Sequence, residues 1–152
     1  MSTQTLSIEL LKNLALMQFN GEEFTIRGDQ AFDSEGNEIA EFEEVYYMVL
    51  TDEEADEKAA DYIKESLWAF NATFLADMTD IPYEAFKAIA DNGKCESNNE
   101  AIERIINKTC GMDEFVQAAV NADGRGHFLS GYDGNENEET LEGITFYIYR
   151  TN

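Results

Sequence analysis

Residues 45–65 have the sequence VYYMVLTDEEADEKAADYIKE, in which a strand pattern is followed at once by a helix pattern. The first six residues are mostly β-branched or aromatic, and such residues favour strands. Thr51 and Glu54 then form a capping-box sequence, in which each side chain can hydrogen-bond the backbone N–H of the other residue. A helix is therefore expected from Thr51, with apolar residues on one side and carboxylates on the other.

The chain before residue 45 predicts one more helix and a meander. Apolar residues recur at helical spacing from Leu6 to Phe19, which predicts a helix that lies in the core or forms a homodimer contact. Residues 24–42 alternate between apolar and polar positions around a turn-forming quartet at residues 34–37. This pattern favours a hairpin or meander, with residues 45–50 as its central strand.

Further helices and a final strand are expected after residue 65. Helices are predicted over residues 83–91, from the capping-box pair Ser97 and Glu100 onward, and over residues 113–121. Residues 144–149 return to a strand pattern. The sequence therefore predicts a single α+β domain over residues 1–152. We expect a mostly antiparallel sheet, made of the N-terminal meander plus the C-terminal strand, with four to five helices packed on it.

The charge of the chain is strongly one-sided, with 32 acidic and 10 basic residues and a formal charge of −22. A disordered acidic tail is excluded because 43% of the residues are hydrophobic and 12% are aromatic, so the acids must cover a folded surface. Such a surface repels nucleic acids and anionic membranes. The charge therefore argues against direct nucleic-acid or membrane binding and favours a basic protein partner.

Targeting and cysteine patterns point to the cytoplasm. The sequence has no run of roughly 18 apolar residues and no signal-peptide pattern, so a soluble, cytoplasmic protein is expected. Cys95 and Cys110 lack metal-type spacing, and we expect two inert, reduced thiols.

The acids are concentrated in three runs, at residues 33–44, 52–65 and 133–142. Carboxylates four residues apart on a helix lie about 5 to 6 Å from each other, a spacing similar in scale to that of successive phosphates. The runs fit either a surface that occupies a DNA-binding groove or a solvated acidic face. The predicted partner-binding residues are Glu35, Glu38, Glu41, Glu43, Glu44, Asp52, Glu53, Glu54, Glu57, Asp61 and Glu65.

The sequence predicts no metal site, no cofactor and no enzymatic activity. A stretch that starts at Asp133 resembles an EF-hand calcium loop, but it lacks the glycine at position six and the bidentate glutamate at position twelve. His127 is the only histidine, and it lies near Asp123 and Arg125 without a recognisable nucleophile motif. A small enzyme centred on His127 is kept as an alternative.

Five tyrosines lie in or beside the predicted strands and turns: Tyr46, Tyr47, Tyr132, Tyr147 and Tyr149. Outward rings beside carboxylates suit a protein interface. Cross-strand packing explains the same residues equally well.

Residues 122–134, ADGRGHFLSGYDG, and residues 146–150, FYIYR, resemble a segment of small acidic proteins from bacteriophages and other mobile elements. Residues 95–102 extend this resemblance. It implies a phage or mobile-element source and expression in the cytoplasm of a bacterial host, and it implies no catalytic residues.

Phages often encode compact acidic proteins that mimic DNA. By analogy of charge and origin, we expect a DNA-mimic-type inhibitor that binds a basic groove on a host restriction, CRISPR or repair protein. The alternative is a phage structural or assembly protein that interacts with copies of itself, with a homodimer through the N-terminal helix as its simplest form.

Overall fold

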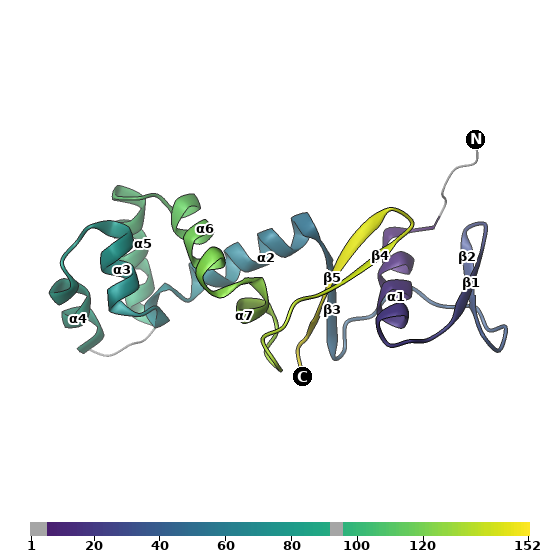
Figure 1. Ribbon diagram of the computed structural model, residues 1–152. Coiled ribbons are helices and arrows are strands. Elements are labelled where there is room, and N and C mark those ends of the chain that lie inside the picture. The colour runs from purple at the N-terminus through teal and green to yellow at the C-terminus, as the bar shows by residue number, and fades with distance from the viewer. Residues whose placement is uncertain (1–5, 92–95) are drawn as a thin grey trace. The chain divides into compact units, whose positions relative to one another are not determined.

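The computed structural model describes residues 6–91 and 96–152, which form two compact units (Figure 1). Unit 1 comprises Met1–Asp56 and Leu129–Asn152, and unit 2 comprises Glu57–Phe128. Each unit has an apolar core of its own. The single domain expected from the sequence stays a prediction, which an unfolding measurement can test.

Unit 1 combines helix α1 with two antiparallel sheets. The smaller sheet is the hairpin β1–β2, and the larger sheet has the strand order β3-β5-β4. This arrangement confirms the predicted α+β class and the antiparallel pairing. The elements are α1 (Ile8–Phe19), β1 (Phe24–Arg27), β2 (Gln30–Asp33), β3 (Tyr47–Thr51), β4 (Asn137–Leu141) and β5 (Ile144–Arg150).

Helix α1 packs on one face of the three-stranded sheet. It begins after Ser7, whose hydroxyl oxygen accepts a hydrogen bond from the Leu10 N–H at 3.0 Å. The apolar stripe of the helix is buried in one cluster with alternate residues of the strands, which share a face because side chains alternate along a strand. The structure therefore shows that the apolar stripe of α1 lies in the core of unit 1. The buried residues are Leu10, Leu11, Leu14 and Ala15 from α1, with Val49, Phe146 and Ile148 from the strands.

The sequence predicted residues 45–50 as the central strand of an N-terminal meander, and this prediction is wrong for strand β3. This strand lies at an edge of the larger sheet and pairs with β5, while β1 and β2 form a separate sheet. Between β2 and β3 the chain follows α1, where the Asn13 side chain donates to the Ala40 carbonyl at 2.7 Å. Alternation along a strand indicates which residues face the core, but it does not indicate which strand is the neighbour.

Unit 2 is helical in its described residues, and its helices pack against one another around Leu67, Ile106 and Phe115. From the sequence, we expected the helices to pack on the sheet. The helices of unit 2 instead turn their apolar stripes toward each other. Helix α2 (Asp52–Glu65) begins in unit 1 and ends in unit 2. The other helices are α3 (Ala72–Thr79), α4 (Tyr83–Asp91), α5 (Asn99–Lys108), α6 (Met112–Asp123) and α7 (Arg125–Leu129), with 3-10 turns at Leu67–Ala69 and Glu96–Asn98.

Candidate functional site

Most of the negative charge of the chain belongs to unit 1. Its sequence has 19 acidic and 3 basic residues, a net charge of −16, whereas unit 2 has 13 acidic and 7 basic residues, a net charge of −6. Fifteen of the 19 acidic residues in unit 1 are exposed. Unit 1 therefore creates most of the electrostatic field that a charged partner would meet.

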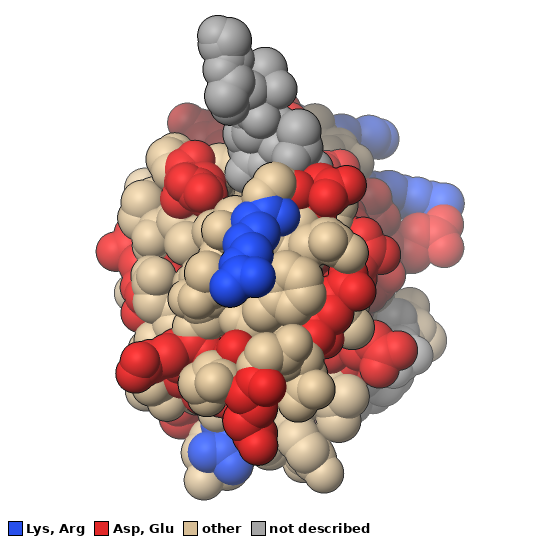
Figure 2. All heavy atoms as spheres, turned by 90° about the vertical axis from the view of Figure 1, so that its right-hand side faces the viewer, with Lys and Arg blue, Asp and Glu red and all other residues tan. Residues whose placement is uncertain are grey.

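The three cations of unit 1 offset little of this charge at its surface. Lys12 is buried, and its Nζ lies 2.9 Å from Oε1 of Glu54 and 3.3 Å from Oε2 of Glu9. Arg27 and Arg150 each lie over an aromatic ring of the same unit. Figure 2 shows the face that carries β1 and β2, where Asp and Glu atoms are widely spread and Lys and Arg atoms cover a small area.

The first acidic run lies in the turn after β2 and in the extended segment that leads to β3. Ile39 and Phe42 of this segment pack against the core of unit 1, so the acidic residues beside them point to solvent. Glu38 and Glu41 also accept hydrogen bonds from side chains of the same unit. The structure therefore places all five predicted carboxylates of this run on the surface of unit 1: Glu35, Glu38, Glu41, Glu43 and Glu44.

Glu54 differs from the other predicted residues because its carboxylate stabilises the fold. Its Oε1 accepts a hydrogen bond from the Thr51 N–H at 3.0 Å, and Oγ1 of Thr51 accepts one from the Glu54 N–H at 3.3 Å, which confirms the first capping box. Partial burial would raise the pKa of Glu54, but the Thr51 hydrogen bonds and the Lys12 ammonium outweigh that effect and lower the pKa. Asp52 and Glu53, in the same turn, are exposed.

Replacing Glu54 by glutamine should therefore destabilise the protein. We expect a loss of about 1 kcal/mol at pH 7, because glutamine can still accept the hydrogen bond from the Thr51 N–H but loses the ion pair with Lys12. Because the folded pKa is lowered, this stabilisation is fully present above the ordinary pKa of 4.5 and is lost as the pH falls through the folded pKa. Urea unfolding at pH 7 and at pH 3 measures the effect, with Glu53→Gln as the matched control. Equal losses for both variants at pH 7 would contradict the structural role of Glu54.

The later acids of α2 lie on a helix segment of mixed charge. Glu57, Asp61 and Glu65 are exposed residues of unit 2, as predicted for an outer helix face. Lys58 and Lys64 are exposed on the same segment and offset much of that charge. The acidic face of α2 is therefore strongest at the start of the helix, within unit 1.

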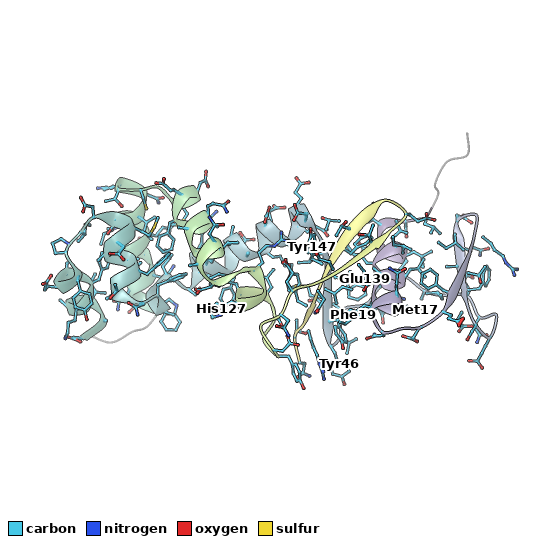
Figure 3. All side chains as sticks on the ribbon, in the orientation of Figure 1. Met17, Phe19, Tyr46, His127, Glu139 and Tyr147 are labelled. Carbon is cyan, nitrogen blue, oxygen red and sulfur yellow. The ribbon has the colours of Figure 1, made fainter. Side chains whose placement is uncertain are left out.

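Some carboxylates of the third acidic run accept hydrogen bonds from other groups of unit 1. The carboxylate of Asp133 accepts hydrogen bonds from the Asn135 N–H at 3.0 Å and the Ser130 hydroxyl at 2.8 Å, and these lower its pKa. Glu139 lies on β4 (Figure 3), and its Oε1 accepts a hydrogen bond from Nε2 of Gln18 in α1 at 2.7 Å. The sequence Asp-Gly-Asn at residues 133–135 is typical of an Asx turn, and it could have predicted the hydrogen bond from the Asn135 N–H to Asp133.

The five tyrosines differ strongly in exposure. Tyr149 is fully buried, and Tyr47 and Tyr147 are half-buried, which fits the packing interpretation. Tyr46 and Tyr132 are each 56% exposed, which fits the interface interpretation. Aromatic contacts with a partner are therefore expected from these last two residues alone.

The residues of the enzyme alternative have no arrangement typical of a nucleophile and its base. His127, on α7, and Asp123, at the end of α6, are exposed and line a pocket of about 510 Å³ in unit 2. Among the residues that the structure describes, the His127 ring forms no hydrogen bond with a hydroxyl or thiol group. The Ser130 hydroxyl hydrogen-bonds the Asp133 carboxylate and a backbone carbonyl, and Cys95 lies outside the described residues.

The described ranges, 6–91 and 96–152, contain neither a metal-type cluster nor a membrane-spanning helix. No three His, Cys, Asp or Glu side chains in them are grouped so as to hold a metal ion. No helix in them has the length and apolar composition that a membrane span needs. Comparisons with protein families, curated proteins and solved structures gave no match.

Proposed function

We propose that this chain is an inhibitor of the DNA-mimic type, which binds a basic groove on a nucleic-acid-processing or defence protein of a bacterial host. The observation that supports this proposal is the surface of unit 1, which exposes fifteen carboxylates while its one lysine is buried. Solubility alone needs a charge of only about 2 to 8 in magnitude for a small domain. The net charge of −16 on unit 1 is well beyond that range.

A groove that binds DNA presents Lys and Arg side chains to phosphates. Exposed carboxylates on unit 1 would pair with those cations and thereby exclude nucleic acid. The contact residues of this proposal are Glu35, Glu38, Glu41, Glu43, Glu44, Asp52 and Glu53, with Glu57, Asp61 and Glu65 extending the acidic helix. Glu54 acts indirectly, because it holds the start of α2 in place.

Tyr46 has an exposed ring, and the ring of Tyr132 is exposed on the face that the Arg150 guanidinium does not cover. Both rings supply contact area within the same unit. Aromatic residues are enriched in interfaces, where they add affinity that charge pairs alone do not give. An interface of this kind combines fast, electrostatically steered association with a slower dissociation that the aromatic contacts provide.

Affinity capture from a bacterial lysate tests the proposal. The immobilised chain should retain nucleic-acid-binding proteins at about 50 mM salt and should release them well below 1 M salt, because salt screens exposed charge pairs. Retention of proteins that bind no nucleic acid, or retention that salt does not change, would contradict the proposal.

The assembly alternative has less support. The apolar stripe that would form a homodimer is buried in the core of unit 1, and Ile8 is the exposed large apolar residue of α1, at 41%. Sedimentation at high salt separates the two alternatives, since an assembly protein would form a defined oligomer there.

A further inference from the structure

Unit 2 has a pocket of about 510 Å³ that none of the proposed partner-binding carboxylates lines. Its walls come from the end of α2, the first turns of α3 and the corner between α6 and α7. Small-molecule sites in proteins have volumes of about 300 to 1,000 Å³. The pocket therefore has the size of a ligand site.

Aromatic side chains form a continuous wall in this pocket. The ring centroid of Phe70 lies 5.7 Å from that of Phe74 and 6.3 Å from that of Phe128, and the Tyr62 ring lies 6.1 Å from Phe128. Phe128 is largely buried, Phe70 and Phe74 are half-buried, and Tyr62 is exposed, so the wall reaches from the core of unit 2 to solvent. The faces of such rings attract cations as well as apolar groups.

The charged residues of the pocket are all of one sign at neutral pH. Asp77 comes from α3 and Asp123 from the end of α6, and no Lys or Arg is among the residues that line the pocket. Within residues 6–91 and 96–152, neither carboxylate forms a hydrogen bond or an ion pair. Their charge is therefore available to a ligand, and an anion would be repelled.

His127 adds a polar group next to this aromatic wall. Its ring meets the Phe128 ring edge to face, with centroids 4.9 Å apart. His127, labelled in Figure 3, belongs to α7 and lines the pocket. A neutral histidine ring has one nitrogen that can accept a hydrogen bond from an ammonium N–H. The chemistry of the site thus combines aromatic side chains, two carboxylates and one acceptor nitrogen.

We propose that this pocket binds a small organic cation, a molecule with an ammonium group on an aromatic or aliphatic body. The body packs on the rings of Phe70 and Phe74, and the ammonium group lies between Asp77 and Asp123. The proposal is independent of the acidic surface of unit 1, because it requires residues of unit 2 only.

Three probes of similar size and different charge test this proposal: 2-phenylethylamine, which is cationic at pH 7.5, neutral 2-phenylethanol and anionic phenylacetate. His127 is the only histidine in the chain, so its ring proton signals in the NMR spectrum report on the pocket without ambiguity. We expect the amine to shift these signals in a saturable way and to bind about tenfold more tightly than the alcohol. Phenylacetate should produce no saturable shift. Equal affinity of amine and alcohol, or no saturation by the amine, would overturn the proposal.

Substitutions of single carboxylates separate a direct contact from the general field of the protein. Asp77→Asn and Asp123→Asn should each weaken amine binding about threefold, as expected for the loss of one exposed charge pair, and should leave binding of the alcohol unchanged. Asp113→Asn is the matched control, because it removes the same charge from unit 2 at a residue that does not line the pocket. A similar loss in all three variants would show that the field alone attracts the amine, and would overturn the site.

Discussion

Neutralising four exposed carboxylates of unit 1 in one variant should weaken binding to the captured partner about 100-fold, at roughly 0.7 kcal/mol for each exposed charge pair. In the part of the chain that the structure describes, these four side chains form no hydrogen bond or ion pair, so the fold should be unaffected. Affinity measured at about 100 mM salt, with far-UV circular dichroism as the check on folding, gives the result. The substitutions are Glu35→Gln, Glu43→Gln, Glu44→Gln and Glu53→Gln.

The matched control removes four negative charges from unit 2 and should weaken binding by less than about threefold. Its substitutions are at exposed acids outside the proposed interface: Asp80→Asn, Glu84→Gln, Asp113→Asn and Glu114→Gln. The salt dependence of binding should also become weaker in the unit 1 variant alone, because fewer ion pairs remain to be screened. Equal losses in the two variants would mean that net charge, and not a surface of unit 1, attracts the partner.

Phe146→Ala should lower the free energy of unfolding by about 4 kcal/mol, the usual cost of removing a buried phenylalanine ring. Phe146 is fully buried on the central strand β5, opposite Thr51 of β3 and Glu139 of β4, so a cavity there affects the whole sheet. Hydrogen exchange of the α1 and β5 amides measures the effect within unit 1. The control is Thr145→Ala, which should cost less than about 1 kcal/mol because Thr145 is half-buried on the other face of the strand.

The same variant tests whether the chain is one cooperative domain. Trp68 is the only tryptophan, and it packs against the core of unit 2, so its fluorescence follows the unfolding of that unit. A single domain, as the sequence predicts, requires the Trp68 transition to shift with Phe146→Ala. A Trp68 transition that stays unchanged while the β5 amides exchange faster would contradict a single cooperative domain.

Local sequence patterns predicted individual helices correctly in two places. The side chains of Thr51 and Glu54 form the predicted capping box, and the helix predicted over residues 83–91 is α4. Asp80 lies shortly before that helix and ends α3 with a positive φ of 59°. A 3-10 turn at Glu96–Asn98 precedes α5, and Asn98 is the N-cap residue of that helix.

The partners of each element could not be predicted, because pairing depends on the path of the chain. Val49 opposes Ile148, about one hundred residues later, and no local pattern specifies that contact. The carboxylates of the candidate surface were recognised from composition, but the burial of Lys12 and its pairing with Glu54 are tertiary contacts. The pocket of unit 2 was missed for the same reason, since its residues come from separate helices.

Competition with DNA tests the proposed mimicry most directly. The affinity of the captured partner for a short DNA duplex is measured at a fixed salt concentration while the concentration of this chain is increased. If the carboxylates of unit 1 occupy the DNA-binding groove, the apparent Kd for DNA should rise in proportion to the concentration of the chain, without a limit. A Kd that reaches a plateau, with partner, DNA and this chain together in one complex, would contradict the proposal.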